Sequence, residues 1–252
     1  MSRARPPLWP VPQDRAERLA LATSYPFAIP EHSYLFFDGA VLPLPAAEDL
    51  RDRTPVLAVG SNQSPDQLRR KFAQLKGSVR CPVTRCWLEG FDVVYATHVT
   101  RYGAIPGNLH PAPGARVRLS VTWLDPDQLA VMHATELTGE NYVFTRLEGA
   151  ALRLEGGKRL DDVLAYVSLE GALNRDGRPI GLAAVEAEAR PHPAVSQADA
   201  LALLHARAGM GASIEDMIIA AINEPAERRR LTEILRRDAI AADWKSLTIL
   251  ER

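Results

Sequence analysis

The chain has 252 residues, of which 46% are hydrophobic and 24% charged, and its formal net charge is -1. These proportions are typical of an ordinary globular protein, and the near-neutral charge gives no electrostatic reason to expect binding to nucleic acid or to an anionic membrane. No apolar run approaches the roughly 20 residues that a membrane-spanning helix needs, and no apolar signal core follows the first residues, so we expect a cytoplasmic protein.

The first 54 residues predict a Pro-rich extension with little regular structure. Prolines recur through residues 1–32, and proline neither continues a helix nor donates to a β-ladder. We expect one short helix over 14–22 and a strand over 33–41 with a turn at Asp38-Gly39. A polar connector over 43–54 completes the segment.

A strand, a turn and a helix follow one another with unusual clarity in the next residues. The apolar run 56–59 predicts a buried strand, and Gly60-Ser61-Asn62 interrupts it. Ser64 suits a helix N-cap, Pro65 the first helical position and Gln67 a capping box. Such a turn leaves backbone N–H groups at residues 60–63 unpaired and directed outward, where they bind a carboxylate or phosphate well.

Two kinds of helix signal continue this pattern further along the chain. The first helix extends to residue 75, and Asp125, Pro126 and Gln128 repeat its starting pattern, which predicts a helix over 125–136. Near the end of the chain, Ser196 and Ser213 each precede apolar residues at helical spacing. The last third of the protein is therefore predicted to be helical.

Strands and loops alternate with these helices. Period-two patterns predict strands over 83–88, 91–98, 117–124, 142–147 and 163–168, the first two separated by a turn at Glu89-Gly90. The Gly- and Pro-rich stretch 102–114 predicts a loop, and the polar stretch 173–193 predicts a surface excursion. Several strands closed by helices at one end favour an α+β fold.

The two cysteines, Cys81 and Cys86, give no evidence of a metal or redox site. A disulfide would need an oxidising compartment, which nothing else in the sequence indicates. A zinc site would need two further ligands at suitable spacing, and only His98 is close. We expect two reduced thiols, no metal and no cofactor.

Several motifs in chain order resemble those of the γ-glutamylcyclotransferase-like family. They are the Gly60-Ser61-Asn62 turn after a strand, the Pro111-Ala112-Pro113-Gly114 turn before the strand 115–124, Glu136 followed by Gly139 and Tyr142, and the strand 164–167. The resemblance covers residues 55–235 and implies a small mixed β-barrel with flanking helices. It also implies that the Gly60 turn and Glu136 meet in one pocket. The chain is then divided into an extension over 1–54, a family-like domain over 55–235 and a C-terminal tail over 236–252.

The chemistry that this resemblance implies is the cyclisation of a γ-glutamyl amide. The free α-amine attacks its own γ-carbonyl, which leaves 5-oxoproline and releases an amine. A single carboxylate can take the proton from the amine and return it to the leaving nitrogen, and this role falls to Glu136, with a pKa raised by a partly apolar pocket. The expected partner is a small γ-glutamyl or carboxylate ligand. The residues expected to contact it are Val59, Gly60, Ser61, Asn62, Gln63, Tyr142 and Tyr166.

Two residues depart from the family pattern and leave the substrate open. Val59 stands where the family has a tyrosine, so an aromatic wall or hydroxyl is missing, and Leu137 stands where the family has a glycine. Neither change removes the proposed chemistry. The alternative function is a non-catalytic module that uses the same fold to bind a small carboxylate or to regulate.

Each candidate residue also has a structural interpretation. A glutamate near a helix end is commonly solvated, Ser61 and Asn62 favour turns by themselves, and tyrosines commonly serve packing. His133 precedes Glu136 by three residues and is either its proton partner or a surface residue. The arginines 228–230 and 236–237 predict a solvated helix face, with a phosphate-binding patch as the alternative.

Overall fold

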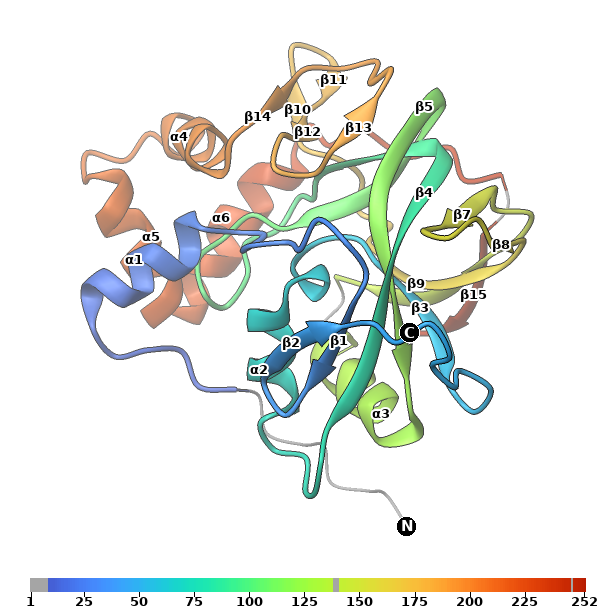
Figure 1. Ribbon diagram of the computed structural model, residues 1–252. Helices are drawn as coiled ribbons and strands as arrows, with labels where there is room; N and C mark the ends of the chain where they lie inside the picture. The colour runs from blue at the N-terminus through green and yellow to red at the C-terminus, as the bar shows by residue number, and fades with distance from the viewer. Residues whose placement is uncertain (1–8, 138–140, 246) are drawn as a thin grey trace.

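One long antiparallel pair of strands, β4 (Arg80–Tyr95) and β5 (Gly107–Leu124), forms the centre of the sheet. The computed structural model describes residues 9–137, 141–245 and 247–252, and the pair runs through the middle of the molecule (Figure 1). Their register shifts between Glu89 and Phe91, where Gly90 has a φ of 80°. The turn expected at Glu89-Gly90 is therefore a bulge within a single strand.

The other strands extend this pair into a mixed sheet. They are β1 (Tyr34–Phe37), β2 (Ala40–Pro43), β3 (Thr54–Ala58), β6 (Val143–Leu147), β7 (Leu152–Leu154), β8 (Arg159–Leu160), β9 (Val163–Val167), β12 (Gly181–Leu182), β13 (Ala187–Glu188), β14 (Ala194–Val195) and β15 (Leu247–Glu251). The sheet has the order β14-β12-β4-β5-β3-β9-β6-β15, with the remaining strands attached beside it. β3 with β9 and β12 with β14 are parallel pairs, and the others are antiparallel.

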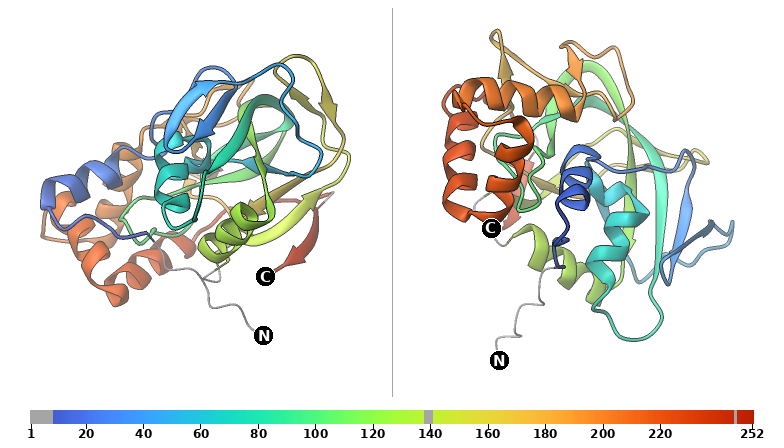
Figure 2. Two further views of the ribbon diagram at one scale, coloured as in Figure 1. Left: turned by 60° about the horizontal axis from the view of Figure 1, so that its bottom comes forward. Right: turned by 90° about the vertical axis from the view of Figure 1, so that its left-hand side faces the viewer.

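The α+β class predicted from the sequence is confirmed, whereas the small barrel is not formed. Within the described residues, the strands at the two ends of the order, β14 and β15, do not pair with each other. The sheet is therefore strongly curved but open (Figures 1 and 2).

The loop predicted over 102–114 is wrong in its second half. β5 already begins at Gly107, and Pro111 lies opposite Phe91 of β4. Proline lacks an N–H donor and fits a strand only where no ladder bond is needed. β3 and β13 pair with β5 only from Arg116 onwards. Among the described strands, none therefore pairs with one side of the proline-containing part.

Among the described residues, six helices cover the sheet in two groups. α2 (Pro65–Phe72) and α3 (Pro126–Glu136) contact each other, and α1 (Arg15–Thr23) lies beside α4 (Gln197–Ala208), α5 (Ile214–Asn223) and α6 (Pro225–Arg236) in the second group (Figures 1 and 2). No helix among the described residues is both long enough and apolar enough to cross a bilayer.

The helix starts follow the sequence closely, with one exception. Capping boxes form at Asp125 in front of α3 and at Ser196 in front of α4, because each side chain accepts the N–H three residues later. Ser64 caps α2 by accepting the N–H of Asp66. The capping box predicted with Gln67 is wrong, because the Gln67 side chain accepts a hydrogen bond from Arg70 instead.

The segment 173–193 is not the surface excursion that its polarity predicted. Four of its apolar residues, Leu173, Ile180, Leu182 and Val185, are buried. Short strands β10 (Asn174–Arg175) and β11 (Arg178–Pro179) form a separate two-stranded sheet. The apolar residues are spaced irregularly, so no period of two or 3.6 marked them as core.

The first 54 residues contain the predicted helix and hairpin, and they join the rest of the protein. β1 and β2 form a hairpin, and β1 also pairs with β4, with Leu35 opposite Pro82. Phe36 of β1 enters a small apolar cluster with Leu68 and Phe72 of α2 and Met132 of α3. This cluster packs α2 and α3 against the sheet, and it therefore fixes the positions of the other side chains that these two helices carry.

Candidate active site

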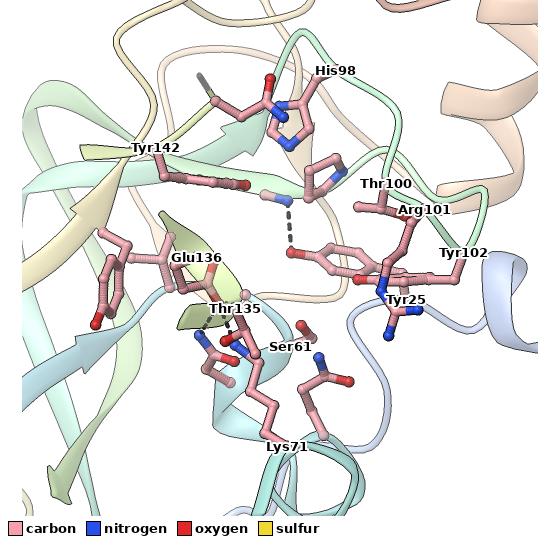
Figure 3. Close-up of a pocket in the computed structure, with 18 of the residues that line it drawn as sticks. Tyr25, Ser61, Lys71, His98, Thr100, Arg101, Tyr102, Thr135, Glu136 and Tyr142 are labelled. Carbon is pink, nitrogen blue, oxygen red and sulfur yellow. Dashed lines mark hydrogen bonds and ion pairs between the residues drawn. The ribbon is translucent and has the colours of Figure 1, made fainter. Parts of the chain in front are cut away.

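A cavity of about 400 Å³ lies where the ends of several elements meet (Figure 3). Concave sites of this size hold small molecules. Its lining comes from the end of β3 and the following turn, α2, the end of α3, the connection from β4 to β5, the start of α6 and the N-terminal segment. The residues are Trp9, Tyr25, Leu57, Val59, Gly60, Ser61, Asn62, Gln67, Lys71, His98, Val99, Thr100, Arg101, Tyr102, Pro106, Gly107, Thr135, Glu136, Asn141, Tyr142, Tyr166 and Arg228.

The Gly60 turn packs against a tyrosine from the N-terminal segment. Tyr25 is buried, and its hydroxyl accepts the N–H of Gly107 at 2.7 Å. A Cβ on Gly60 would lie 2.0 Å from that hydroxyl oxygen, which is far inside the contact distance of close-packed atoms. Glycine is therefore required here by the approach of Tyr25. An aromatic ring and hydroxyl, which Val59 does not supply, thus reach the turn from outside the motif.

The backbone N–H groups of the turn are less free than the sequence predicted. Ser61–Gln63 form one 3₁₀ turn, in which the N–H of Gln63 donates to the carbonyl of Gly60 at 3.2 Å. The N–H of Ser64 donates to the carbonyl of Ser61 at 2.9 Å. A tight turn of this kind consumes its own donors, so fewer N–H groups face the cavity than the four that were expected.

Glu136, the last residue of α3, directs its carboxylate into the cavity. Its Oε1 accepts a hydrogen bond from Asn62 Nδ2 at 3.0 Å and forms a short ion pair with Lys71 Nζ (Figure 3). The structure shows no partner for Oε2 among the described residues. The Gly60 turn and Glu136, which are far apart in the sequence, therefore meet directly.

The expectation of a raised pKa for Glu136 is wrong. Burial raises the pKa of this carboxyl, but the charge and hydrogen bond of Lys71, together with the hydrogen bond of Asn62, lower it below its ordinary 4.5. Desolvation disfavours the charged form, whereas an adjacent cation favours it. The carboxylate is thus held ionised and is a weaker base than an unpaired buried glutamate would be.

Lys71 is the central residue that the sequence analysis missed. It lies on the face of α2 that turns towards α3, its side chain is 3% exposed, and its ammonium also contacts the sulfur of Met132 at 3.6 Å. A lysine is rarely buried this deeply without an opposite charge. The only available sign in the sequence was its spacing from Leu68, which places both residues on the same side of the helix.

Neutral polar groups also line the cavity. Burial, with the nearby charge of Arg236, lowers the pKa of His98 to about 3, so its ring is uncharged at neutral pH. The ring packs edge-on against Tyr142 at 5.1 Å between centroids, and its Nδ1 is buried without a hydrogen-bond partner among the described residues. Burial also raises the pKa of Tyr142 well above 10, so this hydroxyl remains a donor.

The structure brings most of the predicted site residues together. Val59, Gly60, Ser61, Asn62, Glu136, Tyr142 and Tyr166 all line the cavity. Gln63 does not, and this corrects the prediction: its side chain is buried away from the cavity, where its carbonyl oxygen accepts from Arg85 at 2.7 Å and Ser120 at 3.2 Å. Gly139 of the family motif lies outside the described residues.

His133 is not a proton partner of Glu136. Its Nδ1 lies 3.0 Å from the hydroxyl of Tyr166, and its ring packs against Phe144. The three consecutive arginines have different surroundings. Arg228 lines the cavity, whereas Arg229 and Arg230 are exposed to solvent.

Neither a metal cluster nor a reactive thiol is found in the part of the chain that the structure describes. No group of three or more metal-ligating side chains occurs there. Cys81 and Cys86 are both free and buried, and burial raises the pKa of each thiol to about 12. Neither cysteine forms a disulfide in the structure.

Comparisons with known proteins give weak structural likenesses. No family model matches the chain, and no curated protein matches it significantly. It is similar to an Arabidopsis thaliana protein of known solution structure (21% identity, TM-score 0.39, covering 53% of this chain and 79% of that one). It is also similar to a γ-glutamyl cyclotransferase (14% identity, TM-score 0.36, covering 46% of this chain and 66% of that one). A third similar structure is that of an uncharacterised human protein (12% identity, TM-score 0.37, covering 79% of this chain and 95% of that one). Likenesses at this level do not transfer a family or an activity to this chain.

Proposed function

We propose that this protein cyclises a γ-glutamyl amide to 5-oxoproline and releases an amine, with Glu136 as the general acid and base. The observation that carries the proposal is the placement of an ionised carboxylate, whose Oε2 has no partner among the described residues, beside the Gly60-Ser61-Asn62 turn in one cavity. These are the two parts of the sequence that resemble the γ-glutamylcyclotransferase-like family. The proposal includes the division into an extension over 1–54, a domain over 55–235 and a tail over 236–252.

The proposed reaction needs a proton acceptor, a donor to the carbonyl oxygen and a confined substrate. Glu136 Oε2 takes a proton from the α-ammonium, and the freed amine attacks the γ-carbonyl carbon. The Tyr142 hydroxyl donates to the oxygen that becomes negative in the tetrahedral intermediate. Glu136 then returns its proton to the leaving nitrogen, the amide C–N bond breaks, and the extra proton of the ring nitrogen passes to the released amine. Confinement of both reacting atoms in the cavity supplies much of the rate.

The Lys71 ion pair has a kinetic consequence for this mechanism. Because Lys71 lowers the basicity of Glu136, removal of a proton from an ammonium is less favourable than it would be with an unpaired carboxylate. A substrate that arrives as the free amine avoids this step. We expect turnover to rise with pH as the α-amine of the substrate loses its proton.

The test is 5-oxoproline release from a panel of γ-glutamyl peptides, γ-glutamylamines and glutathione. Glu136→Gln retains the size of the side chain but cannot accept the proton, so turnover should fall by about 10²–10⁴-fold. This variant leaves Lys71 without a counter-charge, and the double variant Lys71→Met/Glu136→Gln therefore serves as a charge-balanced control. It should recover stability and remain inactive. Turnover equal to wild type in either variant would exclude Glu136 from the role.

The same ion pair favours a second candidate function, a non-catalytic module that binds a small carboxylate. The ion pair with Lys71 neutralises the charge of Glu136 in the resting protein. In addition, Trp9 and Tyr25 of the N-terminal segment line the cavity. A ligand at about 100 times its dissociation constant raises the free energy of unfolding by roughly 2.7 kcal/mol. The module predicts such stabilisation by small carboxylates, its persistence in Glu136→Gln, and no 5-oxoproline from any substrate.

A further inference from the structure

The hydroxyl of Tyr25 lies between two glycines of the cavity lining. A Cβ on Gly60 would stand 2.0 Å from the hydroxyl oxygen, and a Cβ on Gly107 would stand 3.4 Å from it. The tyrosine itself is buried, and it follows the end of α1 in the first 54 residues of the chain. The absence of a side chain at position 60 therefore lets a hydroxyl from the N-terminal segment reach the cavity.

This hydroxyl accepts hydrogen bonds but has no acceptor for its own proton. The N–H of Gly107 donates to it at 2.7 Å. Burial raises the pKa of Tyr25 well above 10, whereas the N–H groups of Gly107 and Ser61 lower it. A phenol oxygen has one proton to donate besides the bonds that it accepts, and no acceptor for that proton is found in the part of the chain that the structure describes. The Tyr25 O–H is therefore a donor that a ligand oxygen can satisfy.

The hydroxyl of Tyr142 points into the same space (Figure 3). Burial raises the pKa of both tyrosines most strongly, the charge of Glu136 raises each of them further, and Tyr25 raises that of Tyr142. Electrostatic effects of this kind act between groups that lie close together. Two hydroxyls, both protonated at neutral pH, and one carboxylate therefore surround a single space in the cavity.

The Gly60 turn itself offers few donors to that space. The N–H groups of Gln63 and Ser64 already donate to carbonyls inside the turn. Stabilisation of a developing oxyanion needs fixed donors directed at the position where the negative charge appears. The Tyr25 hydroxyl is fixed in this way, because the Gly107 N–H binds its oxygen from the backbone of β5.

We infer that Tyr25 is a catalytic residue that forms an oxyanion hole together with Tyr142, so that residues 1–54 supply part of the active site. The inference rests on the proposed function and adds to it a residue from outside the motifs. The Tyr25 O–H donates a hydrogen bond to the γ-carbonyl oxygen as that oxygen becomes negative, and it keeps its proton throughout. This bond strengthens as the charge develops, so it stabilises the transition state more than the bound substrate.

The experiment compares Tyr25→Phe with wild-type protein, using the γ-glutamyl compound that releases 5-oxoproline fastest. The variant retains the ring but loses the donor, so kcat per folded molecule should fall by about 10²-fold or more while KM stays within about twofold. Tyr95→Phe is the matched control. Tyr95 is also buried, its hydroxyl donates to the carbonyl of Val195 at 3.2 Å, and it is not among the residues that line the cavity. Its kcat should stay within about twofold of wild type.

A second measurement uses p-nitrophenolate, an oxyanion that can bind without being turned over. Its dissociation constant should rise roughly tenfold or more in Tyr25→Phe, as expected for the loss of a hydrogen bond to a charged group. Binding of the neutral p-nitroanisole should not change. If Tyr25→Phe does not fold, Tyr25→3-fluorotyrosine replaces it. This variant keeps the ring and the accepted hydrogen bonds but is a stronger donor, so p-nitrophenolate should bind it more tightly than it binds wild type, and an unchanged affinity overturns the inference.

The outcomes separate this inference from the proposed function. A kcat of Tyr25→Phe within twofold of wild type overturns the inference and leaves the cyclisation intact. A change in KM alone also overturns it, because the hydroxyl then acts on the bound substrate and not on the developing charge. If no γ-glutamyl compound is turned over, the proposed function fails, and p-nitrophenolate decides whether the two donors form an oxyanion site. Weaker binding by Tyr25→Phe supports that site, and equal or absent binding overturns it.

Discussion

Two carboxylates, the buried Asp92 of β4 and the partly buried Glu136 of α3, both lie against positive charge, but their surroundings differ in one respect. Asp92 is 0% exposed; Arg190 donates to both of its oxygens at 2.7 and 2.9 Å, and His192 Nε2 lies 2.8 Å away. The N–H of Val93 adds a further bond at 2.7 Å. Burial raises the pKa of Asp92, but these partners lower it below its ordinary value.

Like Asp92, Glu136 is paired with a positive charge, but only one of its two carboxylate oxygens has a hydrogen-bond partner among the described residues. Lys71 and Asn62 both bind the same oxygen, and the second oxygen has no partner among the described residues and faces the cavity. A buried ion pair therefore does not by itself mark a functional site, because a complete network can simply join two segments. The informative feature is an acceptor left over at a place that a ligand can reach.

The largest effect that separates the two sites is expected from Asp92→Asn. Arg190 would remain buried without its counter-charge, which costs about 3–5 kcal/mol of unfolding free energy. Turnover per folded molecule should be unchanged, because the network has no free acceptor. Urea unfolding and an active-fraction assay measure the two quantities, with the exposed ion-pair variant Glu188→Gln as a control that should cost less than about 1 kcal/mol. If Asp92→Asn lowered turnover without lowering the unfolding free energy, Asp92 would have a functional role and not a structural one.

The next largest effect is expected from Lys71→Met, which leaves Glu136 with Asn62 alone. The variant should lose about 3 kcal/mol at neutral pH, since an unpaired carboxylate remains partly buried. In the wild type the lowered pKa of Glu136 stabilises the fold fully above pH 4.5, and this is lost as the pH falls through the folded-state pKa.

In Lys71→Met burial dominates and raises the pKa of Glu136, so that acidification restores stability to the variant. The difference in unfolding free energy between wild type and variant should therefore shrink as the pH is lowered from 7 towards 4. The exposed substitution Lys76→Met should show no such dependence. A difference that stays constant with pH would mean that Lys71 does not act through Glu136.

A smaller effect follows from His98, the uncharged ring in the cavity. Its folded-state pKa of about 3 lies below its ordinary 6.5, so the unfolded chain binds more protons between these values and stability falls as the pH falls. The loss between pH 7 and pH 5 should be about 2 kcal/mol. His98→Gln should remove it, whereas His205→Gln, at a partly exposed histidine, should not. Unchanged pH dependence in His98→Gln would show that the ring is not buried in its neutral form.

The smallest effect on stability is expected from Asn62→Ala. The variant loses the 3.0 Å bond to Glu136 but also removes Oδ1, which is buried without a partner among the described residues. These contributions oppose each other, so the unfolding free energy should change by less than about 1 kcal/mol. Ligand binding and turnover should suffer more. A loss of several kcal/mol of unfolding free energy with intact turnover would contradict this, and it would mean that Asn62 has a structural role like that of the partners of Asp92.

Local signals explain what could be predicted from the sequence. Ser64, Asp125 and Ser196 each begin a helix because a short polar side chain before a helical pattern satisfies a backbone donor at once. The meeting of the Gly60 turn with Glu136 was expected from the motifs, whereas their roles towards a ligand stay predictions.

Features that depend on long-range contacts could not be predicted. Lys71 resembles any polar helix residue until Glu136 arrives from α3, and its charge then reverses the expected direction of the Glu136 pKa. Tyr25 reaches the cavity from an extension that the proline content marked as irregular. The prolines of β5 indicated a loop because their compatibility with a strand depends on which neighbours are absent.

The contact between Tyr25 and Gly60 constrains how this protein can change in evolution. No residue larger than glycine fits at position 60 while the Tyr25 hydroxyl lies 2.0 Å from where its Cβ would stand. A change at position 60 must therefore follow a change at position 25, and the reverse order is blocked. The residue at position 25 thus limits what position 60 can hold, although 35 positions separate the two in the printed sequence. Residues 59–62 alone indicate that the tyrosine of the motif is missing, because Val59 stands in its place. In the folded chain, Tyr25 packs against the same turn from a distant part of the sequence.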